Sequence, residues 1–164
     1  MDVEEAVSEV RQALYRGDRA GAAALIEAGA PLNVFDAAAI GDSVVLGRLL
    51  ADDRAAVDAW SADGFTALHF AAFLGGPDAV RLCIEAGADI GATARNVMQV
   101  QPLHSAAANG SVESCRLLLE AGADPNAQQQ GGFTPLDEAE HANKRELAAL
   151  LRTYGAHLSG NELP

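Results

Sequence analysis

Two stretches of this 164-residue sequence repeat one pattern: residues 75–89 read GGPDAVRLCIEAGAD and residues 110–124 read GSVESCRLLLEAGAD. In both stretches, twelve steps separate the first Gly from the Gly that precedes Ala-Asp. The same interval recurs from Gly17 to Gly29, from Asn143 to Gly155 and, in degenerate form, from Gly41 to Asp53. The copies open at positions 17, 41, 75, 110 and 143, so the repeat is 33 to 35 residues long, apart from a 24-residue first interval. Self-similarity at this period indicates an array of stacked supersecondary units.

A second segment recurs ahead of three of these copies, at residues 63–72 (DGFTALHFAA), 101–107 (QPLHSAA) and 132–139 (GFTPLDEA). The hydroxyl of Thr66 or Thr134 can cap the start of a helix. Pro102 and Pro135 fit the first helical position, where a missing N–H is tolerated. These segments therefore predict the first helix of each unit.

The stretch from residue 110 to 124 predicts the second helix of the unit. Val112, Cys115 and Leu118–Leu119 follow the three/four spacing of one apolar helix face. Gly87 and Gly122 come directly after the last apolar turn, where a left-handed helix cap favours Gly. Each unit is thus expected to be helix, tight turn, helix and stop, and the chain to be all-α.

The sequence resembles the ankyrin-repeat family, on the motifs GFTALH at 64–69, LLLEAGAD at 117–124 and GFTPL at 132–136. The resemblance implies a solenoid of about five stacked helix-turn-helix units with short β-hairpin loops. We expect one domain over 1–158 and a flexible tail at 159–164. The expected units are approximately 3–33, 34–62, 63–95, 96–128 and 129–158.

Three connections depart from the family pattern. The first interval is short, so residues 33–36 are expected to make a tight bend without a projecting hairpin. The hairpin at 95–100 has about two extra residues and should protrude, and residues 128–130 are three Gln that should form a polar, flexible tip. The position that the family gives to His is Phe35 in the second unit and Asp137 in the last.

Both ends of such an array need a polar outer surface. At the N-terminus, Val3, Val7 and Val10 are expected to face inward, with the acidic residues outward. In the last helix, Leu147, Leu150 and Leu151 should face inward. Four charged residues should face outward: Lys144, Arg145, Glu146 and Arg152.

The composition narrows the possible partners. The net charge is −12, from 23 acidic and 11 basic side chains, so nucleic acid and anionic membranes are not expected as partners, whereas the charge permits a basic protein partner. No run of about 18 apolar residues is present, which argues against a membrane span. The acidic residues 1–5 do not resemble a secretory signal, so we expect a cytoplasmic protein. Ten of the eleven basic residues are Arg, a bias associated with GC-rich bacterial genomes.

Residues that could carry catalysis or bind a metal have simpler structural roles. His69 and His104 occupy equivalent repeat positions, where the family resemblance implies a hydrogen bond that ties a helix start to its neighbour. Cys83 and Cys115 are expected to be buried hydrophobes. Neither a phosphate-binding P-loop nor a nucleophile elbow is present. We expect no enzymatic activity, cofactor or metal; a metal- or ligand-responsive regulator using His69 and His104 is a lesser alternative.

Binding of a protein is the function that the repeat architecture favours. The expected contact residues are those that the fold does not dictate: Trp60, Phe70, Phe73, Leu74, Arg95 and Met98. Trp60 could instead pack back on residues 55–57, and Phe70 could pack between units. We expect a monomer that acts as an adaptor or inhibitor, although self-association through this apolar patch remains open. The alternative is a chaperone-like or structural partner of a co-encoded enzyme or toxin.

Overall fold

The computed structural model describes residues 7–160, and within this range the protein is all-α, with no residue in a β-strand. No helix in this range is both long enough and apolar enough to cross a membrane. The described residues form ten α-helices: α1 (Glu9–Tyr15), α2 (Arg19–Glu27), α3 (Val34–Ile40), α4 (Ser43–Asp52), α5 (Ala67–Phe70), α6 (Pro77–Glu85), α7 (Pro102–Asn109), α8 (Val112–Glu120), α9 (Pro135–His141) and α10 (Arg145–Thr153). Three short helical turns join them: η1 (Arg54–Asp58), η2 (Ala71–Gly75) and η3 (Gln130–Gly132).

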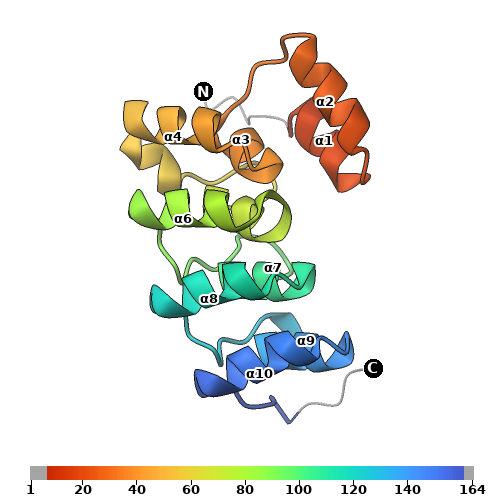
Figure 1. Ribbon diagram of the computed structural model, residues 1–164, viewed down its shortest axis with the longest axis vertical. Helices are drawn as coiled ribbons and strands as arrows, with labels where there is room; N and C mark the ends of the chain where they lie inside the picture. Colours follow the sequence, from red (N-terminus) through yellow and green to blue (C-terminus); the bar gives the residue numbers. More distant parts are fainter. Residues whose placement is uncertain (1–6, 161–164) are drawn as a thin grey trace.

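Consecutive helices pair as antiparallel hairpins, and the pairs stack along the long axis of the molecule (Figure 1). The second helices α4, α6, α8 and α10 form one row. The first helices α3, α7 and α9 form the other row, together with α5, which continues directly into the π-helical turn η2. The predicted helical repeat is confirmed.

The turn inside each pair is closed in the same way. A backbone N–H after the first helix donates to the carbonyl five residues earlier. At Gly17, Gly41, Gly110 and Asn143 the residue before the donor has a positive φ, which makes a left-handed helix end, whereas the corresponding bond from Gly76 closes the π-helical turn η2. The acceptor is a buried Ala at each of five such turns among the described residues: Ala13, Ala37, Ala71, Ala106 and Ala139. Asn143 adopts a φ of 56° at the last of these turns. This explains how Asn can stand where earlier copies have Gly, because Asn tolerates this conformation better than most residues.

The first helices begin at polar caps, as predicted. Pro102 and Pro135 each occupy the first turn of their helix, and Thr134 accepts a hydrogen bond from the N–H of Asp137. The same register corrects one prediction. Asn33 caps α3 through the N–H of Asp36, so Asp36, and not Phe35, is the second-unit counterpart of His69 and His104.

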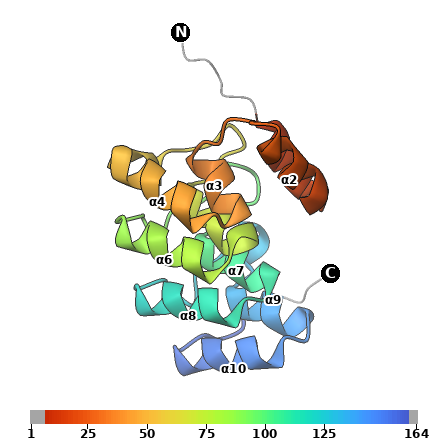
Figure 2. The same ribbon diagram turned by 45° about the horizontal axis from the view of Figure 1, so that its top comes forward.

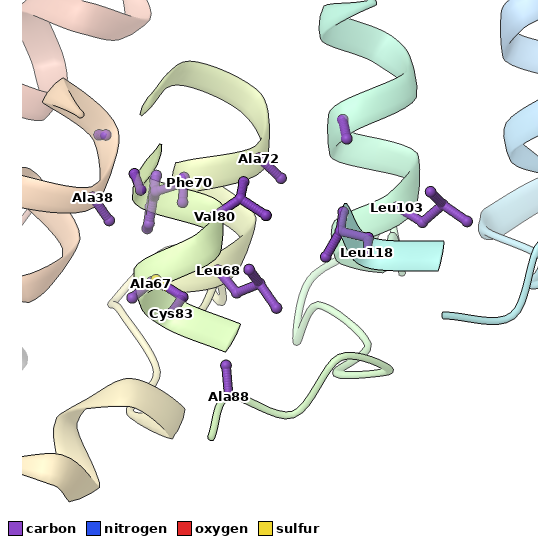
Figure 3. Packing of buried hydrophobic residues seen from close by; sticks show 14 of the residues in the cluster. Ala38, Ala67, Leu68, Phe70, Ala72, Val80, Cys83, Ala88, Leu103 and Leu118 are labelled. Carbon is purple, nitrogen blue, oxygen red and sulfur yellow. The ribbon is translucent and has the colours of Figure 1, made fainter. Parts of the chain in front are cut away.

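The core combines small and large apolar residues from both rows of helices (Figure 3). Ala67 and Ala72 in the first row let the helices approach closely, whereas Val80, Cys83 and Leu118 fill the space between the rows. Cys83 and Cys115 are fully buried, as expected, and burial raises the pKa of each thiol to about 12.

The N-terminal pair does not continue the stack. Helix α1 packs against α3, whereas α2 stands away from α4, so the pair leans toward the first-helix side (Figures 1 and 2). The tight bend predicted at residues 33–36 is wrong, because Asn33 caps α3 and residues 34–36 form its first turn. The connection lies instead at residues 28–33 and holds no projecting hairpin, as predicted. Val10 is buried as predicted, while Val3 lies outside the described residues.

The C-terminal end agrees with the predicted cap except at Lys144. Leu147, Leu150 and Leu151 are buried. Lys144 was expected to face outward, but its Nζ donates to the carbonyls of Ala107 at 2.9 Å and Ala108 at 2.7 Å. The physical reason is that the last carbonyls of α7 lack partners within their own helix.

The loops between pairs are hairpin-like turns held by single backbone hydrogen bonds, so the expected β-hairpins contain no strand among the described residues. The N–H of Ala94 donates to Val100 across the enlarged loop, and the N–H of Arg95 donates to Gly64 in the preceding loop. Val97 and Met98 are exposed at the tip of the enlarged loop, which therefore protrudes as predicted.

Part of the predicted tail is held in place. The N–H of Ser159 donates to the carboxylate of Asp137. Burial alone would raise the pKa of Asp137, but hydrogen bonds from Thr134 and Ser159 lower it below its ordinary value. Residues 161–164 lie outside the described part of the chain.

Candidate binding surface on the first-helix face

A hollow of about 330 Å³ opens on the face of the stack formed by the first helices. We call this the first-helix pocket. Its walls come from α1, from α5 and η2, from α7, from α9 and from the loops that precede α7 and α9. The lining is predominantly apolar and consists of Tyr15, Phe65, His69, Phe70, Phe73, Met98, Val100, His104, Ser105, Ala108, Gln129 and Glu138.

An aromatic cluster forms the floor of the first-helix pocket. Phe70 is only 3% exposed, and its ring centroid lies 5.7 Å from that of Phe65 and 6.0 Å from that of Phe35. Such tilted and edge-on pairs are favourable beyond the area they bury. Because these rings pack on one another, the floor is preformed.

Two buried histidines stand in the wall, and the Nδ1 of each accepts a hydrogen bond from a helix-capping backbone N–H. His69 Nδ1 accepts from the N–H of Thr66 at 3.2 Å, so Nε2 carries the proton and donates to the carbonyl of Val100 at 3.1 Å. Burial lowers the pKa of His69 to about 4 and lowers that of His104 as well. Both rings are therefore neutral near pH 7, and His69 ties its helix start to the neighbouring loop as the family resemblance implied.

The N-terminal pair closes one end of the first-helix pocket. Tyr15 on α1 is half exposed, and its hydroxyl donates to the carboxylate of Asp63. Burial raises the pKa of Tyr15 above its ordinary value, and the hydrogen bond to Asp63 adds to this effect. Arg19 on α2 reaches across to the carbonyl of Leu74 at 3.3 Å. The pair thus contacts the third unit directly, which brings Tyr15 to the pocket.

Sequence reasoning missed Tyr15 and Phe65. The first interval of 24 residues was the available signal for Tyr15, because a shortened connection prevents regular stacking of the N-terminal pair.

The rim of the first-helix pocket carries one charged side chain, Glu138 on α9. Within residues 7–160, its carboxylate has neither a hydrogen-bond nor an ion-pair partner. No Lys or Arg lines the pocket. Phe73 and Met98 are 44% and 52% exposed at the same rim. The opening therefore combines exposed apolar groups with one uncompensated negative charge.

The six residues predicted from the sequence fall into separate groups. Phe70, Phe73 and Met98 line the first-helix pocket, with Phe70 at its floor. Leu74 does not line it. Trp60 and Arg95 also lie outside the lining and stack on each other, with the guanidinium carbon of Arg95 4.1 Å from the indole centroid.

Trp60 is therefore half-buried beneath Arg95. This arrangement is a cation–π contact. The Arg95 stack had not been expected, because the sequence alone does not place the two loops side by side.

The described residues contain no group of three or more His, Cys, Asp or Glu side chains that could hold a metal ion. Ser105 lines the pocket near both histidines, yet within residues 7–160 its hydroxyl hydrogen-bonds to neither ring. A nucleophile activated by a base requires such a contact.

Comparison with known protein families gives a direct match. A family model described as ankyrin repeats (3 copies) matches the chain over two overlapping ranges, residues 12–129 and 93–161. A comparison with curated proteins found no match. The matched regions cover most of the sequence and the whole stack of helical pairs described above, so the chain belongs to the ankyrin-repeat family.

Proposed function

We propose that this protein is a non-catalytic binding module that receives a protein partner on its first-helix face, as an adaptor or inhibitor. Ankyrin repeats are in general protein–protein interaction modules. Stacked repeats build extended binding surfaces from residues that the fold itself leaves free. The observation that carries the proposal is the first-helix pocket, with Phe73 and Met98 exposed at its rim.

The distribution of apolar side chains supports this face. A cluster of exposed apolar groups around a preformed hollow is typical of an interaction site. Exposed apolar residues on the second-helix row are isolated instead, such as Val44 on α4, which is 81% exposed. The second-helix row also has a hollow of about 350 Å³, but charged Arg54 and Glu85 help to line it. Isolated apolar residues on a surface need no functional explanation. The proposal includes a cytoplasmic setting.

Affinity capture from the source cells tests the proposal. The double variant Trp60→Ala/Phe73→Ala removes two aromatic groups from the first-helix side, and Val44→Ala removes a more exposed apolar group from the other row. Hot-spot aromatic residues typically contribute about 2 kcal/mol or more when truncated. The double variant should therefore lose the captured partner while its helical circular dichroism persists, and Val44→Ala should retain it. Equal capture of the partner by the wild type, the double variant and Val44→Ala would contradict the proposal.

A further inference from the structure

We infer that the first-helix pocket is a specificity pocket for one large apolar side chain of the partner, and that an adjacent Arg or Lys of the partner pairs with Glu138. This inference rests on the proposed function and adds the chemistry of the segment that is bound. It is carried by the juxtaposition of the aromatic hollow with the carboxylate of Glu138, which no residue in the described range 7–160 pairs with.

The volume and lining of the pocket set the first requirement. A hollow of about 330 Å³ lies at the small end of ligand sites, which span roughly 300–1,000 Å³. Phe70 forms the floor, and the neutral rings of His69 and His104 offer no free charge. An anionic side chain would lose its hydration there without gaining a charged partner, because no Lys or Arg lines the pocket. A large aliphatic or aromatic side chain fits.

Glu138 sets the second requirement. Lys144 binds the carbonyls that end α7 and Arg95 stacks on Trp60, so both of these cations are already engaged. Asp63, at the other end of the pocket, is held by Tyr15 and by Ser61. Glu138 is therefore the carboxylate at this pocket that is available to pair with a cation of the partner. An ammonium or guanidinium group beside the buried apolar group would satisfy it.

The overall charge argues against a second copy of this chain as the occupant. The chain carries a net charge of −12, so two copies repel each other, while a basic segment is attracted. The occupant is thus a segment of a different protein in which a large apolar residue lies beside Arg or Lys.

Selection from a library of short random peptides on the intact protein tests this inference. We expect enrichment of peptides that place a large apolar residue within two positions of Arg or Lys. The selected peptides are then measured against two matched pairs of variants. Ala108→Phe fills the pocket from an exposed position on α7, and Ala149→Phe makes the same change at an exposed position on α10. Glu138→Lys reverses the charge at the rim, and Glu120→Lys does so on α8.

The expected result is a loss of affinity of about tenfold or more for Ala108→Phe and Glu138→Lys. Ala149→Phe and Glu120→Lys should stay within about twofold of the wild type. The inference is overturned if no peptide is enriched, if enriched peptides lack the apolar–basic pair, or if they bind Ala108→Phe and Glu138→Lys as well as the controls. Capture of the native partner through the first-helix face would still support the proposed function in each of those cases. Conversely, the selected peptides could depend on the pocket while Trp60→Ala/Phe73→Ala captures the native partner as well as the wild type does. That result would contradict the proposed function and leave the peptide specificity of the pocket intact.

Discussion

The Nε of Arg11 donates to Oδ1 of Asp36 at 2.9 Å, and both side chains are only 1% exposed. The guanidinium carbon also lies 5.3 Å from the ring centroid of Phe35 and 5.4 Å from that of Phe70. Arg11 and Asp36 each stand three residues after a helix cap, the position that His69 and His104 occupy in later units. A buried ion pair therefore attaches the N-terminal pair to the stack at the point where regular stacking ends.

Arg11→Ala should destabilise the protein by about 3–5 kcal/mol, because it leaves the buried carboxylate of Asp36 without its charged partner. Urea unfolding measures the change. The matched control is Arg152→Ala, which breaks the exposed Arg152–Glu140 pair and should change stability by less than about 1 kcal/mol. Amide exchange should show the loss of protection first in residues 8–27. Equal effects of the two substitutions would contradict the structural role assigned to Arg11.

Acid should destabilise the protein through His69. The pKa of His69 is lowered from 6.5 to about 4 in the folded protein, chiefly by burial. Between these pH values the unfolded chain binds a proton that the folded chain does not, so the free energy of unfolding falls as the pH is lowered. The full shift corresponds to about 3 kcal/mol.

Unfolding of the wild type and of His69→Gln, followed from pH 7 to pH 4, checks this expectation. The variant should be less stable at pH 7 but should lose less stability on acidification. Parallel curves for the two proteins would show that His69 does not titrate as described.

Lys144→Met should destabilise the protein by about 1–2 kcal/mol, since it keeps the aliphatic chain but removes the charged donor to the carbonyls of Ala107 and Ala108. Arg145→Met changes the neighbouring exposed side chain and should alter stability by no more than about 0.5 kcal/mol. Thermal unfolding distinguishes the two. If both variants unfold at the same temperature, the cap that Lys144 forms on α7 makes no measurable contribution to stability.

Gly41→Ala should be more damaging than Gly87→Ala. Both residues have positive φ, 80° and 92°, which alone costs about 1 kcal/mol for a residue with a Cβ. A Cβ at Gly41 would also overlap the carbonyl oxygen of Gly75, whereas one at Gly87 meets open space. We expect a loss of about 2–4 kcal/mol for Gly41→Ala in chemical denaturation. A smaller loss than that of Gly87→Ala would mean that α3 and η2 can separate without penalty.

The repeat, the helix type and most helix ends could be predicted from the sequence because local chemistry determines them. Pro102 and Gly87 mark a helix start and a helix end through restrictions on their own backbone. Phe35 is one residue away from Asp36, the true counterpart of the family histidine. The second copy is degenerate, and only its cap, Asn33, defines the register.

Long-range contacts were harder to predict. The ion pair of Arg11, the inward turn of Lys144 and the stacking of Arg95 on Trp60 each join residues from different units. Their geometry depends on how the pairs stack, and the periodicity of the helices does not specify it. The same applies to the site: Phe70, Phe73 and Met98 belong to the predicted surface, while Tyr15 reaches it only because the N-terminal pair leans over.

Hydroxyl-radical footprinting of the protein alone and in complex with its captured partner tests the central claim most directly. Tyr15, Phe73 and Met98 are reactive side chains exposed on the first-helix side, and Tyr154 at the end of α10 is an exposed reference of comparable chemistry. The account predicts that oxidation of Tyr15, Phe73 and Met98 falls in the complex while that of Tyr154 is unchanged. Protection of Tyr154 with unchanged oxidation of Phe73 and Met98 would contradict it.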